Sequence, residues 1–267
     1  MKISSFSMKV FRQPWESLIR RTALAFCVLT LVWICGAQQK GAKSTSKTAA
    51  PVYKNLPVSG LKALAEKGDR EAQNELGLAY ASGLKGQKVN FEEAFKLFRT
   101  AADQGLAGAQ YNLGSLYFFG SGVPRDNQEA LKWYRKSADQ GFIPAQFYLG
   151  WMHANGKGVE EDFQEAIKWF KKAADQGDSE AQRSLGTMYL RGEDLNPDYV
   201  EAYKWLNLSA AQGNTNAIKQ RNKLSVSMTQ EQIAEGQRRA VQMLEKRTNV
   251  AGSKPPPGGT PPPSPKK

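Results

Sequence analysis

The sequence predicts an all-α fold, an α-α superhelical solenoid of helix-turn-helix repeats of about 36 residues. Two markers recur in step along the middle of the chain. The strings AQNELG, AQYNLG, AQFYLG and AQRSLG, followed by one degenerate copy, begin at Ala72, Ala109, Ala145, Ala181 and Ala217. Glycines recur with the same spacings at Gly68, Gly105, Gly141, Gly177 and Gly213. Self-similarity at a fixed period is the signature of stacked structural repeats.

Residues 1–37 are predicted to be a signal peptide or a membrane anchor. Five basic residues precede an apolar run from Ala23 to Ala37, and this run is shorter than the roughly 20 apolar residues that span a bilayer. Basic, apolar and small-residue blocks in this order are typical of a signal peptide, so we expect cleavage before Gln38 and export to the periplasm or the medium. The alternative is that residues 22–37 remain as an anchor in the inner membrane.

The charge is concentrated at the two ends of the chain. The net charge is +12, yet residues 51–245 carry equal numbers of acidic and basic side chains. Because binding to a phosphate backbone requires a concentrated basic surface, we expect no nucleic-acid partner. Residues 38–58 are small, polar and basic with two prolines, which is typical of a linker.

Each unit within residues 59–224 is predicted to contain two helices with apolar packing faces. In the second unit, the first helix presents Ala109, Leu113, Leu116, Tyr117 and Gly120 on one face. The second helix presents Ala130, Trp133, Tyr134, Ser137 and Ala138. Large rings beside small residues are what closely packed helices require.

Polar residues mark the ends of the second helices. We expect N-caps at Asn90, Asp126, Asp162 and Asp198, each followed three residues later by glutamate, which is the spacing of a capping box. The recurring glycines, such as Gly105, are expected to end these helices in the left-handed conformation.

The C-terminal part is predicted to contain one more helix and a tail. Residues 225–248 form a capping helix whose start is marked by Thr229 and Gln232. Residues 249–267 form a Pro-rich, basic, disordered tail, because each proline lacks a backbone N–H and excludes helical geometry in the residue before it. The tail is either a ligand or tether for another surface, or a solvated segment without a partner.

Together these motifs resemble the Sel-one-like repeat (SLR) family, which is related to tetratricopeptide repeats. The resemblance rests on Ala-Gln-x-x-Leu-Gly, a Gly-x-Gly-Val loop ending in Asp, Ala-x-x-Trp and Ala-Asp-Gln-Gly, and it covers about residues 59–224. It implies a right-handed superhelix that serves as a protein-binding scaffold, often exported in bacteria. His153 departs from the pattern, because it stands where the other units have tyrosine.

The sequence contains no recognisable catalytic machinery. His153 is the only histidine, so neither a Ser-His-Asp triad nor a multi-histidine metal site is possible. Acidic pairs such as Asp126 and Glu129 recur in every unit and are explained by helix capping. We therefore predict no enzyme activity, no cofactor and no metal.

A binding groove is predicted from side chains that point away from the packing face of the first helices. Its residues are Tyr111, Phe118, Phe147, Trp151, Asn155 and Arg183. Aromatic and arginine side chains are the types that anchor binding hot spots. The alternative is that these rings pack between neighbouring first helices.

The predicted function is that of an exported scaffold or adaptor that binds a protein or peptide on the concave face of the solenoid. The alternative is a cell-envelope factor that recognises a glycan such as peptidoglycan or exopolysaccharide, with Asn112, Tyr148 and Asn155 as polar contacts. Membrane association is expected only through an uncleaved N-terminal segment.

Overall fold

The computed structural model describes residues 50–192 and 196–251. The predicted signal peptide or anchor, most of the predicted linker and nearly all of the predicted tail lie outside these residues. Within the described ranges every element is an α-helix, and none of these helices is long and apolar enough to cross a membrane. The chain divides into two compact units between Gln176 and Gly177.

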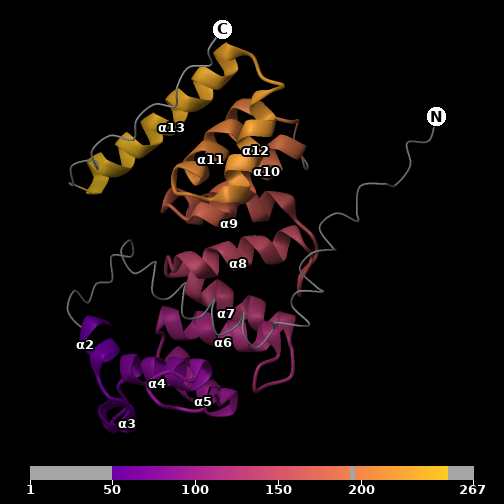
Figure 1. Cartoon of the computed structure of the whole chain (residues 1–267). Coiled ribbons are helices and arrows are strands. Elements are labelled where there is room, and N and C mark those ends of the chain that lie inside the picture. The colour runs from indigo at the N-terminus through magenta and orange to yellow at the C-terminus, as the bar shows by residue number, and fades with distance from the viewer. Residues whose placement is uncertain (1–49, 193–195, 252–267) are drawn as a thin grey trace. The chain divides into compact units, whose positions relative to one another are not determined.

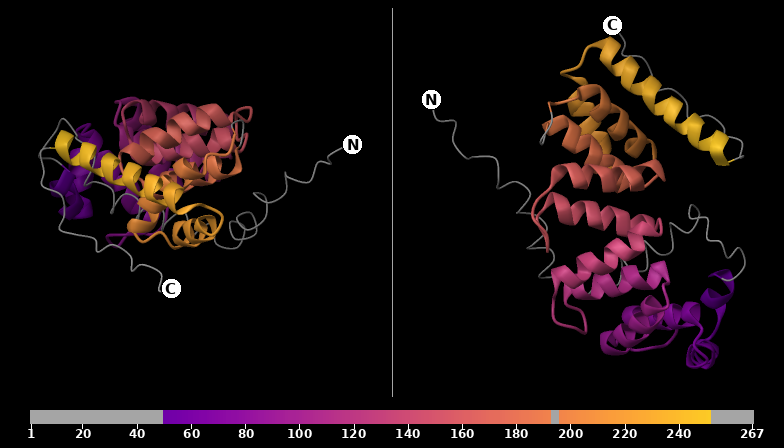
Figure 2. Two further views of the ribbon diagram at one scale, coloured as in Figure 1. Left: turned by 90° about the horizontal axis from the view of Figure 1, so that it is seen from above. Right: turned by 180° about the vertical axis from the view of Figure 1, so that it is seen from behind.

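The first unit is a stack of helical hairpins (Figures 1 and 2). Two short helices come first, α2 (Ala50–Asn55) and α3 (Val58–Glu66). Three hairpins follow, made of α4 (Arg70–Ser82) with α5 (Phe91–Asp103), α6 (Ala107–Phe119) with α7 (Asn127–Asp139), and α8 (Ile143–Ala154) with α9 (Phe163–Asp175). From α3 to α9 each helix packs against the next one, and α2 contacts α4.

The second unit continues the same pattern. Its helices are α10 (Ser179–Arg191), α11 (Tyr199–Ala211), α12 (Thr215–Ser225) and α13 (Gln230–Ala251). Helix α11 packs against α10, α12 and α13. The consecutive helix pairs of both units confirm the predicted all-α solenoid of helix-turn-helix repeats.

The N-terminal end of the array differs from the predicted linker, because residues 50–55 and 58 are helical. Tyr53 and Leu56 pack against the apolar cluster around Leu61, and the Tyr53 hydroxyl donates a hydrogen bond of 2.8 Å to Asp69 Oδ2. These contacts recruit the end of the predicted linker into the fold.

The predicted packing faces form the core. In the second hairpin Ala109, Leu113 and Leu116 are fully buried. Trp133 and Tyr134 from the second helix are buried as well. Gly120 was expected on this face, but it is exposed and ends α6 at φ 70°, where a side chain would be strained.

The glycine of each Leu-Gly pair lets a large side chain approach the first helix closely. A Cβ atom on Gly114 would lie 2.9 Å from Tyr134 Cδ1, and one on Gly150 would lie 2.9 Å from Phe170 Cδ1. Both distances are shorter than carbon atoms tolerate. The repeated glycine therefore sets the spacing between the two helices of a hairpin.

The predicted N-caps are confirmed, but only half of each capping box forms. The side-chain oxygen of the cap accepts from the backbone N–H three residues on, at Asn90, Asp126, Asp162 and Asp198. The backbone N–H of the same caps donates to the carbonyl oxygen of Tyr80, Tyr117, His153 and Tyr189. The glutamate is thus released from the cap. Glu129 and Glu165 accept from the indole Nε1 of Trp133 and Trp169 at 3.1 and 2.9 Å.

Glutamine amides join successive repeats in the first unit. Gln140 Nε2 donates to Gln110 Oε1 at 2.7 Å, and Gln110 Nε2 donates to the Ala102 carbonyl oxygen at 3.2 Å. The same relay joins Gln104 to Gln73 and Ala65, and Gln176 to Gln146 and Ala138. Each buried amide is thereby satisfied, as burial requires.

Candidate functional site

Two of the predicted groove residues belong to the core instead. Tyr111 is 5% exposed and Phe118 is 7% exposed, and both join the main apolar cluster. Their outward direction on α6 does not expose them, because Tyr148 on the next first helix covers them. The Tyr148 ring centre lies 5.9 Å from that of Tyr111 and 6.3 Å from that of Phe118. The prediction that these two rings line an open groove is therefore wrong.

Three neighbouring aromatic side chains of α8 are half-buried and reach the surface: Phe147, Tyr148 and Trp151. We call them the α8 aromatic surface. Trp151 lies edge-on to Phe118, and Phe147 lies edge-on to Tyr148, with 5.6 Å between the ring centres in each pair. Contacts of this geometry hold the rings in place. The α8 aromatic surface is therefore the outer layer of a rigid aromatic core.

Trp151 differs from Trp133 and Trp169 in the state of its indole N–H. The Nε1 atoms of Trp133 and Trp169 each donate to a glutamate. Among the residues that the structure describes, Trp151 Nε1 has no hydrogen-bond partner. Tryptophan usually satisfies this donor when buried, whereas the indole of Trp151 is only half-buried.

The two polar residues of the predicted groove have other partners. Asn155 Nδ2 donates to the Trp151 carbonyl oxygen at 2.8 Å at the end of α8. Arg183 belongs to the second unit, where its guanidinium pairs with Glu180 at 2.9 Å. Asn112, a predicted polar contact for a glycan, is buried and donates to Asn74 Oδ1 at 2.9 Å. Asn112 is therefore not accessible to a ligand.

His153 lies beside this surface and faces inward. It is buried, and its Nε2 atom lies 3.3 Å from Arg135. Its Nδ1 atom is buried and has no hydrogen-bond partner within residues 50–192 and 196–251. Burial, and then the nearby Arg135 charge, lower the pKa of His153, and the opposing effect of Glu165 does not cancel them.

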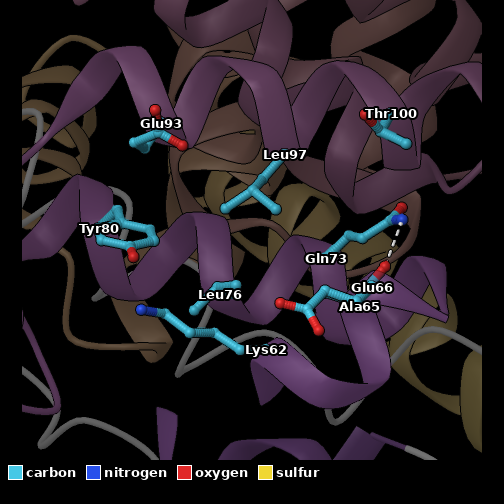
Figure 3. A pocket seen from close by; sticks show the side chains of 9 residues that line it. All are labelled: Lys62, Ala65, Glu66, Gln73, Leu76, Tyr80, Glu93, Leu97 and Thr100. Carbon is cyan, nitrogen blue, oxygen red and sulfur yellow. Dashed lines mark hydrogen bonds between the residues drawn. The ribbon is translucent and has the colours of Figure 1, made fainter. Parts of the chain in front are cut away.

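A pocket of about 400 Å³ lies between α3, α4 and α5, and sequence reasoning missed it. Figure 3 shows Leu97 pointing from α5 toward the gap, with Tyr80 and Glu93 on one side and Gln73 and Thr100 on the other. The other lining residues are Lys62, Ala65, Glu66 and Leu76. The signal in the sequence was Leu97, which stands where the following units have tryptophan.

The described part of the chain offers no metal centre. It contains no group of three or more histidine, cysteine, aspartate or glutamate side chains placed to hold an ion.

Solved structures with the same arrangement are known. A protective antigen of uropathogenic Escherichia coli with an SLR fold is 32% identical, with a TM-score of 0.66, over 76% of this chain and 45% of that one. A Sel1 repeat protein from Oxalobacter formigenes is 29% identical, with a TM-score of 0.59, over 72% of this chain and 77% of that one.

A relative identified by its sequence also contains repeats of this kind. A sel1-like repeat-containing protein of Acanthamoeba polyphaga mimivirus is 32% identical over 111 residues, which are 39% of this chain. The aligned part spans only 20% of that viral protein's length.

The sequence pattern of the Sel1 repeat matches this chain four times in succession. The matches cover residues 70–106, 107–142, 143–178 and 179–214. Each of the four segments holds one first helix and one second helix. Since the matches cover more than half of the chain, this protein belongs to the Sel1 repeat family.

Proposed function

We propose that this protein is an exported scaffold or adaptor that binds a protein or peptide partner through the α8 aromatic surface. Solenoids of Sel1 repeats are typically protein-interaction scaffolds, which supports the class of function. The observation that carries the location is the half-buried Trp151, with its indole N–H unpaired among the described residues and its ring held against Phe118.

The rigidity of the α8 aromatic surface favours binding. Phe147 is fixed between Tyr148 and Phe170, with ring centres 5.6 Å apart in both contacts. A side chain that is already ordered loses little conformational entropy when a partner covers it. Large, preordered aromatic rings are the residues that dominate binding energy at protein interfaces.

A glycan is the second candidate ligand, and the same test separates it from a protein. Rings with an unpaired indole donor can stack on a sugar and donate to its hydroxyl groups. The burial of Asn112 removes one of the polar contacts expected for a glycan. The structure therefore favours the protein or peptide partner.

The test compares the full chain with two variants, Trp151→Ala and Phe147→Ala. Each of the three proteins is titrated with partners that the full chain recovers from envelope proteins and, in parallel, with purified cell-wall polymers. We expect each variant to lose about 2 kcal/mol of binding to the protein partner, or roughly thirtyfold in Kd. Tight binding to the polymers instead would assign the surface to a glycan.

Tyr117→Ala is the matched control, because Tyr117 is a half-buried aromatic on α6 whose ring packs edge-on against Phe95 at 5.5 Å. It should bind like the unchanged chain. Normal binding and normal melting of Trp151→Ala and Phe147→Ala would move the recognition surface away from α8.

A further inference from the structure

The pocket between α3, α4 and α5 occupies the position that a tryptophan fills in the next two repeats. Leu97 precedes Trp133 by 36 residues, and Trp133 precedes Trp169 by 36 residues. The two indoles are 3% and 4% exposed. Leu97 is shorter and only half-buried, and a space of about 400 Å³ remains beside it.

The groups that hold the indole in the second hairpin have counterparts in the pocket. Trp133 Nε1 donates to Glu129 at 3.1 Å, and the Arg99 guanidinium lies 5.4 Å from the ring centre. Glu93 stands 36 residues before Glu129, and Lys62 stands 37 residues before Arg99. Both Glu93 and Lys62 line the pocket. The acceptor and the cation for an indole are therefore present without the indole.

The rest of the lining suits a flat apolar ring. Leu76 and Leu97 form apolar walls, and Tyr80 supplies an aromatic one. Lys62 Nζ already lies 5.9 Å from the centre of the Tyr80 ring, so the cation is held over the aromatic wall. The volume falls in the range of small-ligand pockets, ~300–1,000 Å³.

We propose that this pocket binds the tryptophan side chain of a peptide partner. The indole N–H donates to the Glu93 carboxylate, and the Lys62 ammonium lies against the ring, as Glu129 and Arg99 act on Trp133. The site is separate from the α8 aromatic surface, so the inference goes beyond the proposed function and its test is independent of it.

The test titrates the full chain with N-acetyl-L-tryptophan amide and with its N1-methyl analogue. The methyl group removes the indole donor and leaves the ring, so we expect about tenfold weaker binding, as for a lost hydrogen bond to a charged acceptor. Glu93→Gln should weaken binding of the amide and leave binding of the methylated analogue nearly unchanged. Failure of the unchanged chain to bind the amide overturns the proposal.

The second experiment uses Leu97→Trp, a variant in which the chain itself fills the pocket with an indole. We expect this variant to melt at a higher temperature and to lose binding of the amide, while Leu97→Ala, the matched control, still binds. Binding that persists in Leu97→Trp places the ligand elsewhere and overturns the proposal. If the amide binds only after Trp15→Phe and Trp33→Phe, a tryptophan of this chain itself occupies the pocket. That result overturns the proposal that the pocket binds a partner's tryptophan.

Discussion

The imidazole of His153 stands where the other repeats place a phenol, at Tyr80, Tyr117 and Tyr189. A phenol stays neutral at physiological pH, whereas an imidazole ionises near it. His153 faces the cationic Arg135 and the carboxylates of Asp162 and Glu165. Its lowered pKa means that the folded state holds the ring neutral, so this single substitution within the repeat pattern makes stability depend on pH.

We expect the free energy of unfolding to decrease as pH falls, and we expect His153→Tyr to abolish this part of the pH dependence. In the unfolded chain His153 takes up a proton below about pH 6.5, whereas in the folded chain its lowered pKa opposes protonation. The contribution of neutral His153 to stability is therefore complete above that pH. It is lost as pH falls toward the pKa of the folded state. One such proton changes the free energy of unfolding by at most about 1.4 kcal/mol per pH unit.

Urea unfolding of the unchanged chain and of His153→Tyr at pH 7.5, 6.0 and 5.0 checks this. Because His153 is the only histidine, the difference between the two curves isolates its titration. Equal losses of stability in both proteins would contradict the prediction.

The second helices combine a core function and a polar function in one element. In α9 the Trp169 ring is buried, its Nε1 donates to Glu165, and the Lys172 ammonium lies 3.6 Å from its centre. Burial alone would raise the pKa of Glu165, but hydrogen bonds from Lys168 and Trp169 outweigh it and lower that pKa. The carboxylate therefore stays charged and fixes the indole.

Trp169→Ala should lower the free energy of unfolding by about 3–5 kcal/mol, as truncation of a buried aromatic does. The half-buried Trp151→Ala is the control and should lose clearly less. Denaturant melts of both variants measure the difference. A loss below about 0.5 kcal/mol for Trp169→Ala would mean that this ring lies outside the core.

The elements were predictable because their signals are local. The caps at Asp126 and Asp162 and the packing face around Trp133 follow from spacing within one helix. The burial of Tyr111 and Phe118 was not predictable in this way, because it depends on Tyr148 in the next repeat. Contacts between repeats have no signature in the helical period of a single segment.

The same limit hid two other features of the first unit. The pocket between α3, α4 and α5 exists because Leu97 is smaller than the tryptophan of the following repeats. Such a missing side chain becomes visible only when the repeats are compared position by position. The glutamine relay joins side chains 30 residues apart, such as Gln110 and Gln140. Both residues recur in the sequence, but periodicity alone does not show that they touch.

At the scale of the whole molecule, the repeat array and the chain ends differ in net charge. The net charge of +12 arises outside residues 51–245, where acidic and basic side chains balance. The basic residues before Ala23 are those expected of a signal peptide or anchor. The balanced array is suited to a scaffold whose specificity comes from rings and hydrogen bonds.

A chain with a C-terminal tag should lose a fragment that ends near Ala37 and should be found outside the cytoplasm. Cell fractionation and N-terminal sequencing of the tagged protein check this. Full-length protein in the membrane fraction would support the anchor formed by residues 22–37. Full-length soluble protein in the cytoplasm would contradict export.

The glutamine relay has a consequence for how such a protein changes over generations. If residues 107–142 were excised, Gln146 would meet the Ala102 carbonyl in place of that of Ala138, because both carbonyls now accept from equivalent amides. Gly158 would likewise meet the helix start that Gly122 now contacts. Recombination between repeated coding segments can therefore lengthen or shorten the array by whole units without inventing an interface, which makes its length a heritable variable.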